Sequence, residues 1–261
     1  MSLITRRKFA AILGLAAVEG AVRTGVAQSH GGEHAPIPPK KAVAKTAPPP
    51  APAPKLDRSA ASPEELWGDL MEGNKRFASG KTATRDVVGA RARTANSQVP
   101  YVTVLCCSDS RLSPELIFDQ NIGDLFVVRT AGNIADPIAL GSMEYAVEHL
   151  HSRMLVVLGH ERCGAVAATL SGEPMPTDNL AALVAKIKPG IERLKGLVQG
   201  DTLMSLAVEA NVHHSASNVV EMSPIVRHEV ASGKLTVVKA VYKLGTGEVI
   251  RLGGNFTESH D

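Results

Sequence analysis

Two cysteines and one histidine of the chain have the residue types and the spacing of a metal site. Cys107 is followed closely by Asp109 and Arg111, and His160 and Cys163 come about fifty residues later. Thiolate and imidazole ligands together suit zinc. Three protein ligands leave one coordination position open, which is typical of a catalytic rather than a structural zinc ion. The spacing therefore predicts hydrolytic or hydration chemistry at a zinc ion held by Cys107, His160 and Cys163.

Runs rich in valine and leucine predict the elements that position these residues. Buried strands are expected over residues 101–106, 124–129 and 154–159, and a helix over about 137–150. Strands that are apolar on both faces and alternate with helices are typical of parallel sheets. The sequence therefore predicts an α/β fold with a mainly parallel central β-sheet flanked by helices.

Such a sheet would bring the three candidate ligands together. Cys107 and His160 each come just after a predicted strand, and open α/β sheets place their sites at the carboxyl ends of the strands. Cys163 precedes a helix expected over residues 164–170, where the free amides and the helix dipole favour a thiolate. Ligands that are far apart in the sequence are thus expected to meet at one edge of the sheet.

An N-terminal helical arm is predicted before the sheet. Ser62 is suited to cap the helix, Pro63 suits its first position, and Glu65 completes a capping box. Gly80 is expected to end the helix. Residues 81–99 show only weak periodicity and are expected to be mostly loop.

The last third of the chain is predicted to be helical and then to form a β-hairpin. Helices are expected over about residues 178–198 and 202–232. Residues 235–242 alternate in polarity and are expected to pair with residues 248–252 in a C-terminal hairpin. Interruptions of the helices are expected at three residues that disfavour helix, near Pro189, Gly200 and Pro224.

Residues 1–27 resemble an export signal. Arg6 and Arg7 stand before Phe9, as in a twin-arginine signal, and an apolar run over residues 10–18 follows. That run is about nine residues long, whereas a helix that crosses a bilayer needs roughly 20, so no stable membrane span is expected. These features predict a periplasmic protein exported through a twin-arginine-type signal. The alternative is a cytoplasmic protein with a basic N-terminal arm.

The rest of the chain divides into a linker and one domain. Residues 28–57 have the proline- and alanine-rich composition of a disordered linker. Residues 58–261 are enough for one domain with a proper core, and we expect them to form the zinc-binding catalytic domain. From residue 57 onward the chain holds 20 basic and 24 acidic residues, a formal charge of −4. This balance gives no support for binding to nucleic acid.

Four stretches of this domain agree with one known family in residue type and in spacing. They are Cys107-x-Asp109-x-Arg111, Arg129-Thr130-Ala131-Gly132-Asn133, Gly141-Ser142-Met143-Glu144-Tyr145-Ala146 and His160-x-x-Cys163-Gly164-Ala165. Together they resemble the β-class carbonic anhydrases, and the likeness covers about residues 62–254.

The resemblance implies a zinc-dependent carbonic anhydrase with one Zn2+ per subunit. Such an enzyme interconverts carbon dioxide and bicarbonate by the attack of a zinc-bound hydroxide. It also implies a homodimer or tetramer, whose N-terminal helices reach onto the partner subunit. A zinc-bound water with a pKa of about 7 is known from a carbonic anhydrase with three histidine ligands. Two thiolates donate more charge than imidazoles, so by themselves they should make the bound water less acidic.

Four residues are expected to assist this reaction. Asp109 is expected to accept a hydrogen bond from the hydroxide and to aim its lone pair at carbon dioxide. Arg111 would hold Asp109 ionised through a charge-assisted pair. The backbone N–H of Gly164, at a helix start, is a candidate donor to the developing bicarbonate. Gln120 is a candidate substrate contact, by its likeness to a glutamine of the family.

Two other functions agree with the same residues. Relatives on this scaffold hydrolyse carbonyl sulfide or carbon disulfide, and the difference lies in the access channel. The other function is that of a non-catalytic binding module stabilised by zinc, which would need a fourth protein ligand at the metal.

Strand alternation turns Cys106 away from Cys107, so we expect Cys106 to pack as a small hydrophobe. The pairs His149/His151 and His213/His214 are expected to be solvated helix surface rather than proton shuttles.

Overall fold

A five-stranded sheet lies at the centre of the molecule. The computed structural model describes residues 57–253 except residues 59 and 195, so the predicted export signal and almost all of the predicted linker lie outside the described residues. The strand order is β2-β1-β3-β4-β5. The strands are β1 (Val102–Cys107), β2 (Leu125–Thr130), β3 (Met154–His160), β4 (Thr236–Tyr242) and β5 (Val249–Arg251).

The pairing of the strands confirms a mainly parallel sheet. The pairs β1–β2, β1–β3 and β3–β4 are parallel, and only β5 runs antiparallel, on β4. Every residue of β1 and β3 is buried, which explains why these central strands are continuous apolar runs without alternation. The predicted C-terminal hairpin is confirmed, and its first strand also joins the parallel sheet through β3.

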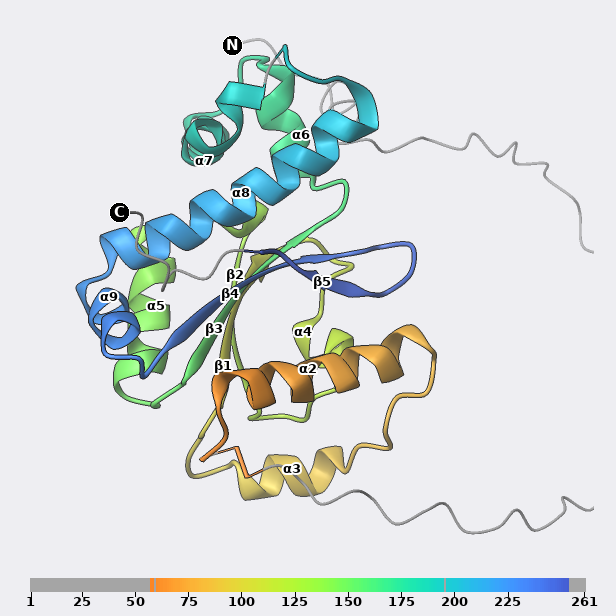
Figure 1. The fold of residues 1–261 in the computed structure, drawn as a ribbon, viewed down its shortest axis with the longest axis vertical. Coiled ribbons are helices and arrows are strands. Elements are labelled where there is room, and N and C mark those ends of the chain that lie inside the picture. Colours follow the sequence, from red (N-terminus) through yellow and green to blue (C-terminus); the bar gives the residue numbers. More distant parts are fainter. Residues whose placement is uncertain (1–56, 59, 195, 254–261) are drawn as a thin grey trace, which may run out of the picture.

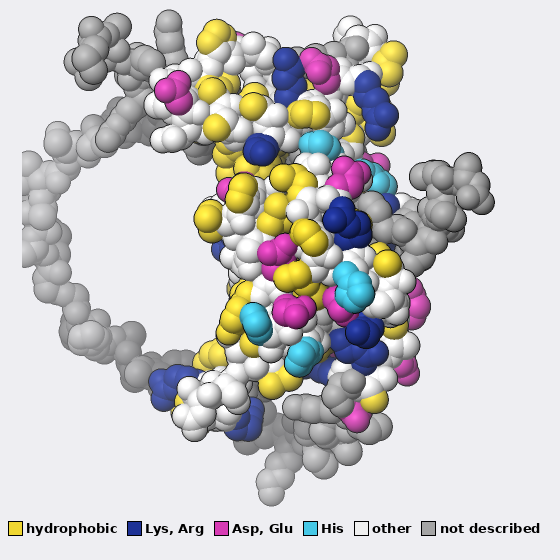
Figure 2. Space-filling view, turned by 90° about the vertical axis from the view of Figure 1, so that its left-hand side faces the viewer, with side chains coloured by type: hydrophobic (Ala, Val, Ile, Leu, Met, Phe, Trp, Pro, Cys, Tyr) yellow, Lys and Arg dark blue, Asp and Glu magenta, His cyan; other side chains and the backbone are white. Residues whose placement is uncertain are grey.

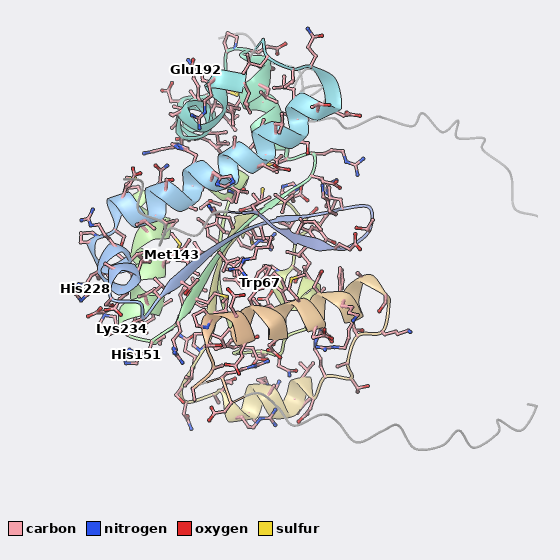
Figure 3. The ribbon with its side chains drawn as sticks, in the orientation of Figure 1. Trp67, Met143, His151, Glu192, His228 and Lys234 are labelled. Atoms are coloured by element: carbon pink, nitrogen blue, oxygen red, sulfur yellow. The ribbon has the colours of Figure 1, made fainter. Side chains whose placement is uncertain are left out.

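Helices cover both faces of the sheet. Figure 1 shows α5, α8 and α9 on one face and α2 with α3 on the other. Met143 of α5 and Trp67 of α2 are both buried, and Figure 3 labels them on the two sides of the strands. The described helices are α2 (Pro63–Ala78), α3 (Val87–Arg93), α4 (Pro114–Ile117), α5 (Pro137–Glu148), α6 (Gly164–Ser171), α7 (Asp178–Ile191), α8 (Gly200–Met222) and α9 (Pro224–Ala231), with 3-10 turns η1 (Ala131–Asn133) and η2 (Glu192–Leu194).

The capping box predicted for the N-terminal arm is present. The Ser62 amide donates to Glu65 Oε2 at 2.7 Å, and the Glu65 amide donates to Ser62 Oγ at 3.3 Å. The helix ends at Ala78, and Gly80 follows with φ +69°, a conformation that glycine adopts without strain. The start and the end of this arm are therefore set by local chemistry.

One expectation about the helices was wrong, and one short helix was not expected. Residues 81–99 are mostly loop, as predicted, but α3 forms within them, and its Asp86 cap accepts a hydrogen bond from the Gly89 amide at 2.8 Å. Pro189 does not interrupt α7 but lies inside it. Proline removes one hydrogen bond and crowds the preceding turn, and α7 ends only two residues later, at Ile191. The interruptions expected near Gly200 and Pro224 are confirmed.

Within the part of the chain that the structure describes, no helix combines the length and the hydropathy that crossing a membrane requires.

Candidate metal centre

The three candidate ligands meet at the carboxyl edge of the sheet. Cys107 is the last residue of β1, His160 is the last residue of β3, and Cys163 is the N-cap residue of α6. Because β1 and β3 are parallel neighbours, their carboxyl ends lie side by side. The two sulfur atoms and a ring nitrogen of His160 all lie within 4.8 Å of one another, and all three residues are buried. Each strand ends one residue later than predicted, so the ligands belong to the rigid sheet.

The imidazole of His160 is prepared to bind a metal ion. Its Nδ1 lies 2.9 Å from the carbonyl oxygen of Glu161. A carbonyl can only accept, so we assign the proton to Nδ1 and the lone pair to Nε2. The buried Nε2 has no hydrogen-bond partner among the described residues. A buried acceptor without a partner costs roughly 1–3 kcal/mol, and a metal ion would remove that cost.

The pKa values of the two cysteines are shifted in opposite directions. A hydrogen bond from the Cys163 thiol lowers the pKa of Cys107, helped by the Gly132 amide, although burial acts in the opposite direction. The same hydrogen bond and burial raise the pKa of Cys163. Zinc binding would release the proton of the Cys163 thiol, because a cysteine ligates as the thiolate. The donor set of two thiolates and one neutral imidazole nitrogen therefore fits zinc.

An ionised carboxylate lies beside these ligands. Asp109 Oδ2 lies 3.9 Å from His160 Nε2. Arg111 donates to both oxygens of Asp109, from Nε at 2.9 Å and from Nη2 at 2.7 Å, and its backbone amide donates to Oδ1 at 2.9 Å. These side-chain hydrogen bonds lower the pKa of Asp109 to about 2 in spite of its partial burial. The carboxylate is therefore charged and fixed in orientation near neutral pH.

Two further residues shape this site, and the sequence reasoning gave them no role. Arg129 donates to the carbonyl oxygens of Cys107, at 3.3 Å, and of Asp109, at 2.8 Å, and so holds the turn that carries the carboxylate. The Gly132 amide donates to Cys107 Sγ at 3.2 Å. Both residues belong to the stretch 129–133, which was noted only as part of a resemblance. The match of this stretch to the family is the signal in the sequence that could have identified the roles of Arg129 and Gly132.

The remaining predicted site residues lie in different places. Gly164 is the first residue of α6, directly after the ligand Cys163. Gln120 is buried, and its amide accepts from Arg58 Nη2 at 2.8 Å and donates to the Phe118 carbonyl at 2.9 Å. No contact among the described residues joins Gln120 to the candidate metal ligands, so its role in binding substrate stays a prediction.

The histidine pairs and Cys106 lie outside the ligand group. His151 precedes β3 and His160 ends it, so a strand of seven residues, about 20 Å long, separates them. Figure 3 labels His151 with His228 and Lys234, and Figure 2 shows histidines among charged side chains on that face. Cys106 is buried, and burial raises its pKa to about 12, as for a thiol that packs as a hydrophobe.

Comparison with known proteins decides the family of the chain. The family model described as carbonic anhydrase matches residues 102–249, which include β1 to β4 and all three candidate ligands. The chain belongs to the carbonic anhydrase family.

Individual carbonic anhydrases are similar over most of the described domain. Carbonic anhydrase 2 of Mycobacterium tuberculosis is 36% identical over 193 residues, which are 72% of this chain and 92% of that protein. A carbonic anhydrase of Pseudomonas aeruginosa is 30% identical over 201 residues, or 71% of this chain and 87% of that protein. Both alignments extend beyond the metal-site motifs.

Solved structures place the fold in the β class. The β-carbonic anhydrase of Coccomyxa, solved with acetazolamide, superposes with a TM-score of 0.60 at 30% identity and covers 76% of this chain and 89% of its own. One of two tetrameric β-carbonic anhydrases of Sordaria macrospora superposes with a TM-score of 0.60 at 25% identity, over 74% of this chain and 100% of its own. The chain therefore has the α/β fold of the β-carbonic anhydrases.

Proposed function

We propose that the chain catalyses the reversible hydration of carbon dioxide to bicarbonate and a proton, with one zinc ion held by Cys107, His160 and Cys163. The observation that carries this proposal is the buried, unpartnered Nε2 of His160, which lies within 4.8 Å of both cysteine sulfurs. When bound, zinc supplies a Lewis acid that makes a water molecule nucleophilic near neutral pH.

Asp109 orients the attacking water in this proposal. Its carboxylate is ionised, so it can only accept a hydrogen bond. Accepting a hydrogen bond from the attacking oxygen orients that oxygen so that a lone pair is directed at the carbon of carbon dioxide. Arg111 binds both carboxylate oxygens and so prevents Asp109 from rotating away. The free amide of Gly164, at the start of α6, would donate to the oxygen on which negative charge develops.

Stopped-flow hydration of carbon dioxide with a pH indicator tests the proposal. The zinc-loaded protein should be active across pH 7 to 9. Asp109→Asn should lose on the order of a hundredfold in kcat/KM, because the amide can present a donor where an acceptor is needed. Asp178→Asn, which changes an exposed carboxylate of α7, is the matched control and should keep full activity.

The same experiment separates the other functions. A zinc-loaded protein without activity across pH 7 to 9 would favour a non-catalytic binding module. Such a module needs a fourth protein ligand, whereas the cluster found among the described residues has three. Faster turnover of carbonyl sulfide or carbon disulfide than of carbon dioxide would assign the chain to the alternative hydrolases. Full activity in Asp109→Asn would remove the role proposed for that carboxylate.

We further propose that the chain forms a homodimer or a tetramer in which two copies pair along β2. β2 is an edge strand of the sheet. Beside it, the side chains of Ile138 and Tyr145 are 80% and 46% exposed. The Tyr145 ring packs against the Phe126 ring of β2, with 6.3 Å between the ring centroids. Light scattering should show a dimer or tetramer that Ile138→Lys dissociates. Ile250→Lys, on the opposite edge strand, should leave the assembly intact.

Export to the periplasm remains our proposal for the location of the protein. It rests on Arg6 and Arg7 before the short apolar run of residues 10–18. Cell fractionation of the full chain should place it in the periplasm, and Arg6→Lys with Arg7→Lys should retain it in the cytoplasm. Wild type found in the cytoplasm would favour the alternative of a basic N-terminal arm.

A further inference from the structure

We propose that Asn211, in the middle of α8, is a positioning residue for the metal centre. It holds the turn that contains Gly132, and this turn aims an amide at the sulfur of Cys107. The inference rests on the proposed zinc site. It assigns to α8 a part in setting how much charge Cys107 donates to the metal.

The first contact joins Gly132 to the ligand sulfur. Gly132 lies in η1, directly after β2, and its amide donates to Cys107 Sγ at 3.2 Å. Its φ is +72°, which favours glycine. A Cβ atom at this position would lie 2.6 Å from Ile187 Cδ1 and 3.1 Å from Ala165 Cβ. The backbone conformation thus favours glycine where the amide meets the sulfur, and a larger residue would have to displace the end of the Ile187 side chain.

The second contact joins Asn211 to the same turn. Asn211 is 1% exposed, and its Nδ2 donates to the Gly132 carbonyl at 2.8 Å. The amide and the carbonyl of Gly132 belong to the two peptide planes on either side of its Cα. Fixing the carbonyl therefore limits how far the amide can rotate from the sulfur. One turn further along α8, Ser215 Oγ accepts from Asn133 Nδ2 at 3.4 Å and supports the same turn.

The position of Asn211 on its helix argues for a specific role. It lies on a buried face of α8 with Val208 and Val212, where an apolar residue would avoid the cost of burying an amide. Its Oδ1 has no hydrogen-bond partner among the described residues, so the amide makes its hydrogen bond through Nδ2 alone. Val212 packs so closely on β3 that a Cβ atom at Gly159 would collide with it. One helix thus packs against the strand of His160 and holds the turn that contacts Cys107.

The chemical effect of the amide on the sulfur has a definite sign. A hydrogen bond donated to a thiolate withdraws charge from the sulfur, so the metal receives less charge and remains a stronger Lewis acid. This offsets part of the extra donation that two thiolates bring compared with imidazoles. Losing the Asn211 contact should let the Gly132 amide turn away and make Cys107 a stronger donor.

The cobalt-substituted full chain tests the inference through its sulfur-to-cobalt charge-transfer band. Asn211→Leu, which has a similar volume and no donor, should shift that band to lower energy than in wild type. In the zinc enzyme, kcat/KM at pH 7 should fall on the order of tenfold and its pH midpoint should rise. Asn211→Ser shortens the side chain, should give the same shifts, and carries the test if the leucine variant does not fold.

Val212→Ala is the matched control, since it opens a cavity on the same buried face without touching the turn. It should lower Tm and leave the band and the pH midpoint unchanged. If the folded Asn211 variants leave both unchanged as well, Asn211 is merely structural and the inference is overturned. The inference is also overturned if Val212→Ala shifts the charge-transfer band as far as the Asn211 variants do. The spectral readout needs no turnover, so failure of carbon dioxide hydration in wild type would remain a separate result.

Discussion

Arg111 binds the Asp109 carboxylate through both of its oxygens, with side-chain hydrogen bonds of 2.9 and 2.7 Å. The guanidinium is itself half exposed, whereas the Asp109 side chain is 18% exposed. The pair therefore joins a solvated cation to a carboxylate that faces the metal ligands. Arg111 can therefore act on Asp109 in two ways, by keeping its carboxylate charged and by fixing its orientation, and the two effects can be tested separately.

Arg111→Gln is expected to lower activity through orientation alone. The folded-state pKa of Asp109 is depressed to about 2. Loss of Arg111 would raise it toward the usual value of about 3.9, which is still far below an assay pH of 7. Asp109 therefore stays ionised in the variant. Stopped-flow assays should show kcat/KM lower by on the order of tenfold or more, with the pH midpoint unchanged.

Arg93→Gln is the control for this variant, because it removes an exposed guanidinium that pairs with Asp86 at 3.3 Å, outside the site. It should leave kcat/KM unchanged. A pH midpoint that moves into the range of pH 6 to 9 in Arg111→Gln would mean that Arg111 acts mainly on the ionisation of Asp109, against our account.

Zinc is expected to stabilise the folded chain through His160. A ligand at one hundred times its Kd adds about 2.7 kcal/mol to the free energy of unfolding, which for a domain of this size raises Tm by about 5 to 10 °C. Thermal unfolding of wild type should show this rise when zinc is added back after chelation. His160→Ala should lose most of the rise, whereas His213→Ala, on α8, should keep it. Equal rises in all three proteins would place zinc elsewhere.

Asn74 is expected to be a major stabilising residue away from the site. Its Nδ2 donates to the Ile117 and Gly247 carbonyls at 3.1 and 2.8 Å, and its Oδ1 accepts from the Val249 amide at 2.9 Å. Asn74→Ala would leave these backbone groups without partners, at a cost of about 3 kcal/mol or more in the free energy of unfolding. Urea titration measures this cost.

Asn96→Ala, on the exposed loop before β1, should change that free energy by less than about 0.5 kcal/mol. The folded Asn74 variant should keep the wild-type kcat/KM, because its contacts tie α2 to the C-terminal hairpin rather than to the ligands. A variant as stable as wild type would show that water replaces the lost amide.

The convergence of the ligands was predictable because two signals in the sequence agree. The apolar runs before Cys107 and His160 predict buried parallel strands, and parallel strands end at one edge of a sheet. The short helix α3 was missed because small and charged residues hide its period, although Asp86 is a recognisable cap. The interruption expected at Pro189 lies two residues later, where α7 ends at Ile191, because the proline removes a hydrogen bond to the preceding turn without breaking the helix at its own position.

The contacts that tune the site were not predictable in the same way. Asn211 and Ser215 stand out as polar residues at helical spacing among buried valines and alanines. Nothing in that pattern identifies the Gly132 carbonyl, 79 residues earlier, as the partner of Asn211. Such long-range hydrogen bonds depend on how the helices pack, which local periodicity does not determine.

Zinc K-edge X-ray absorption on the purified protein at alkaline pH tests the central claim most directly, together with elemental analysis. We predict one zinc per chain, with two sulfur neighbours at about 2.3 Å and two lighter neighbours at about 2.0–2.1 Å. The spectrum should be the same in Asp109→Asn, because one lighter neighbour is the His160 nitrogen and the other comes from solvent. A chain without bound zinc, a third sulfur neighbour, or a lighter neighbour that disappears with Asp109 would contradict the account.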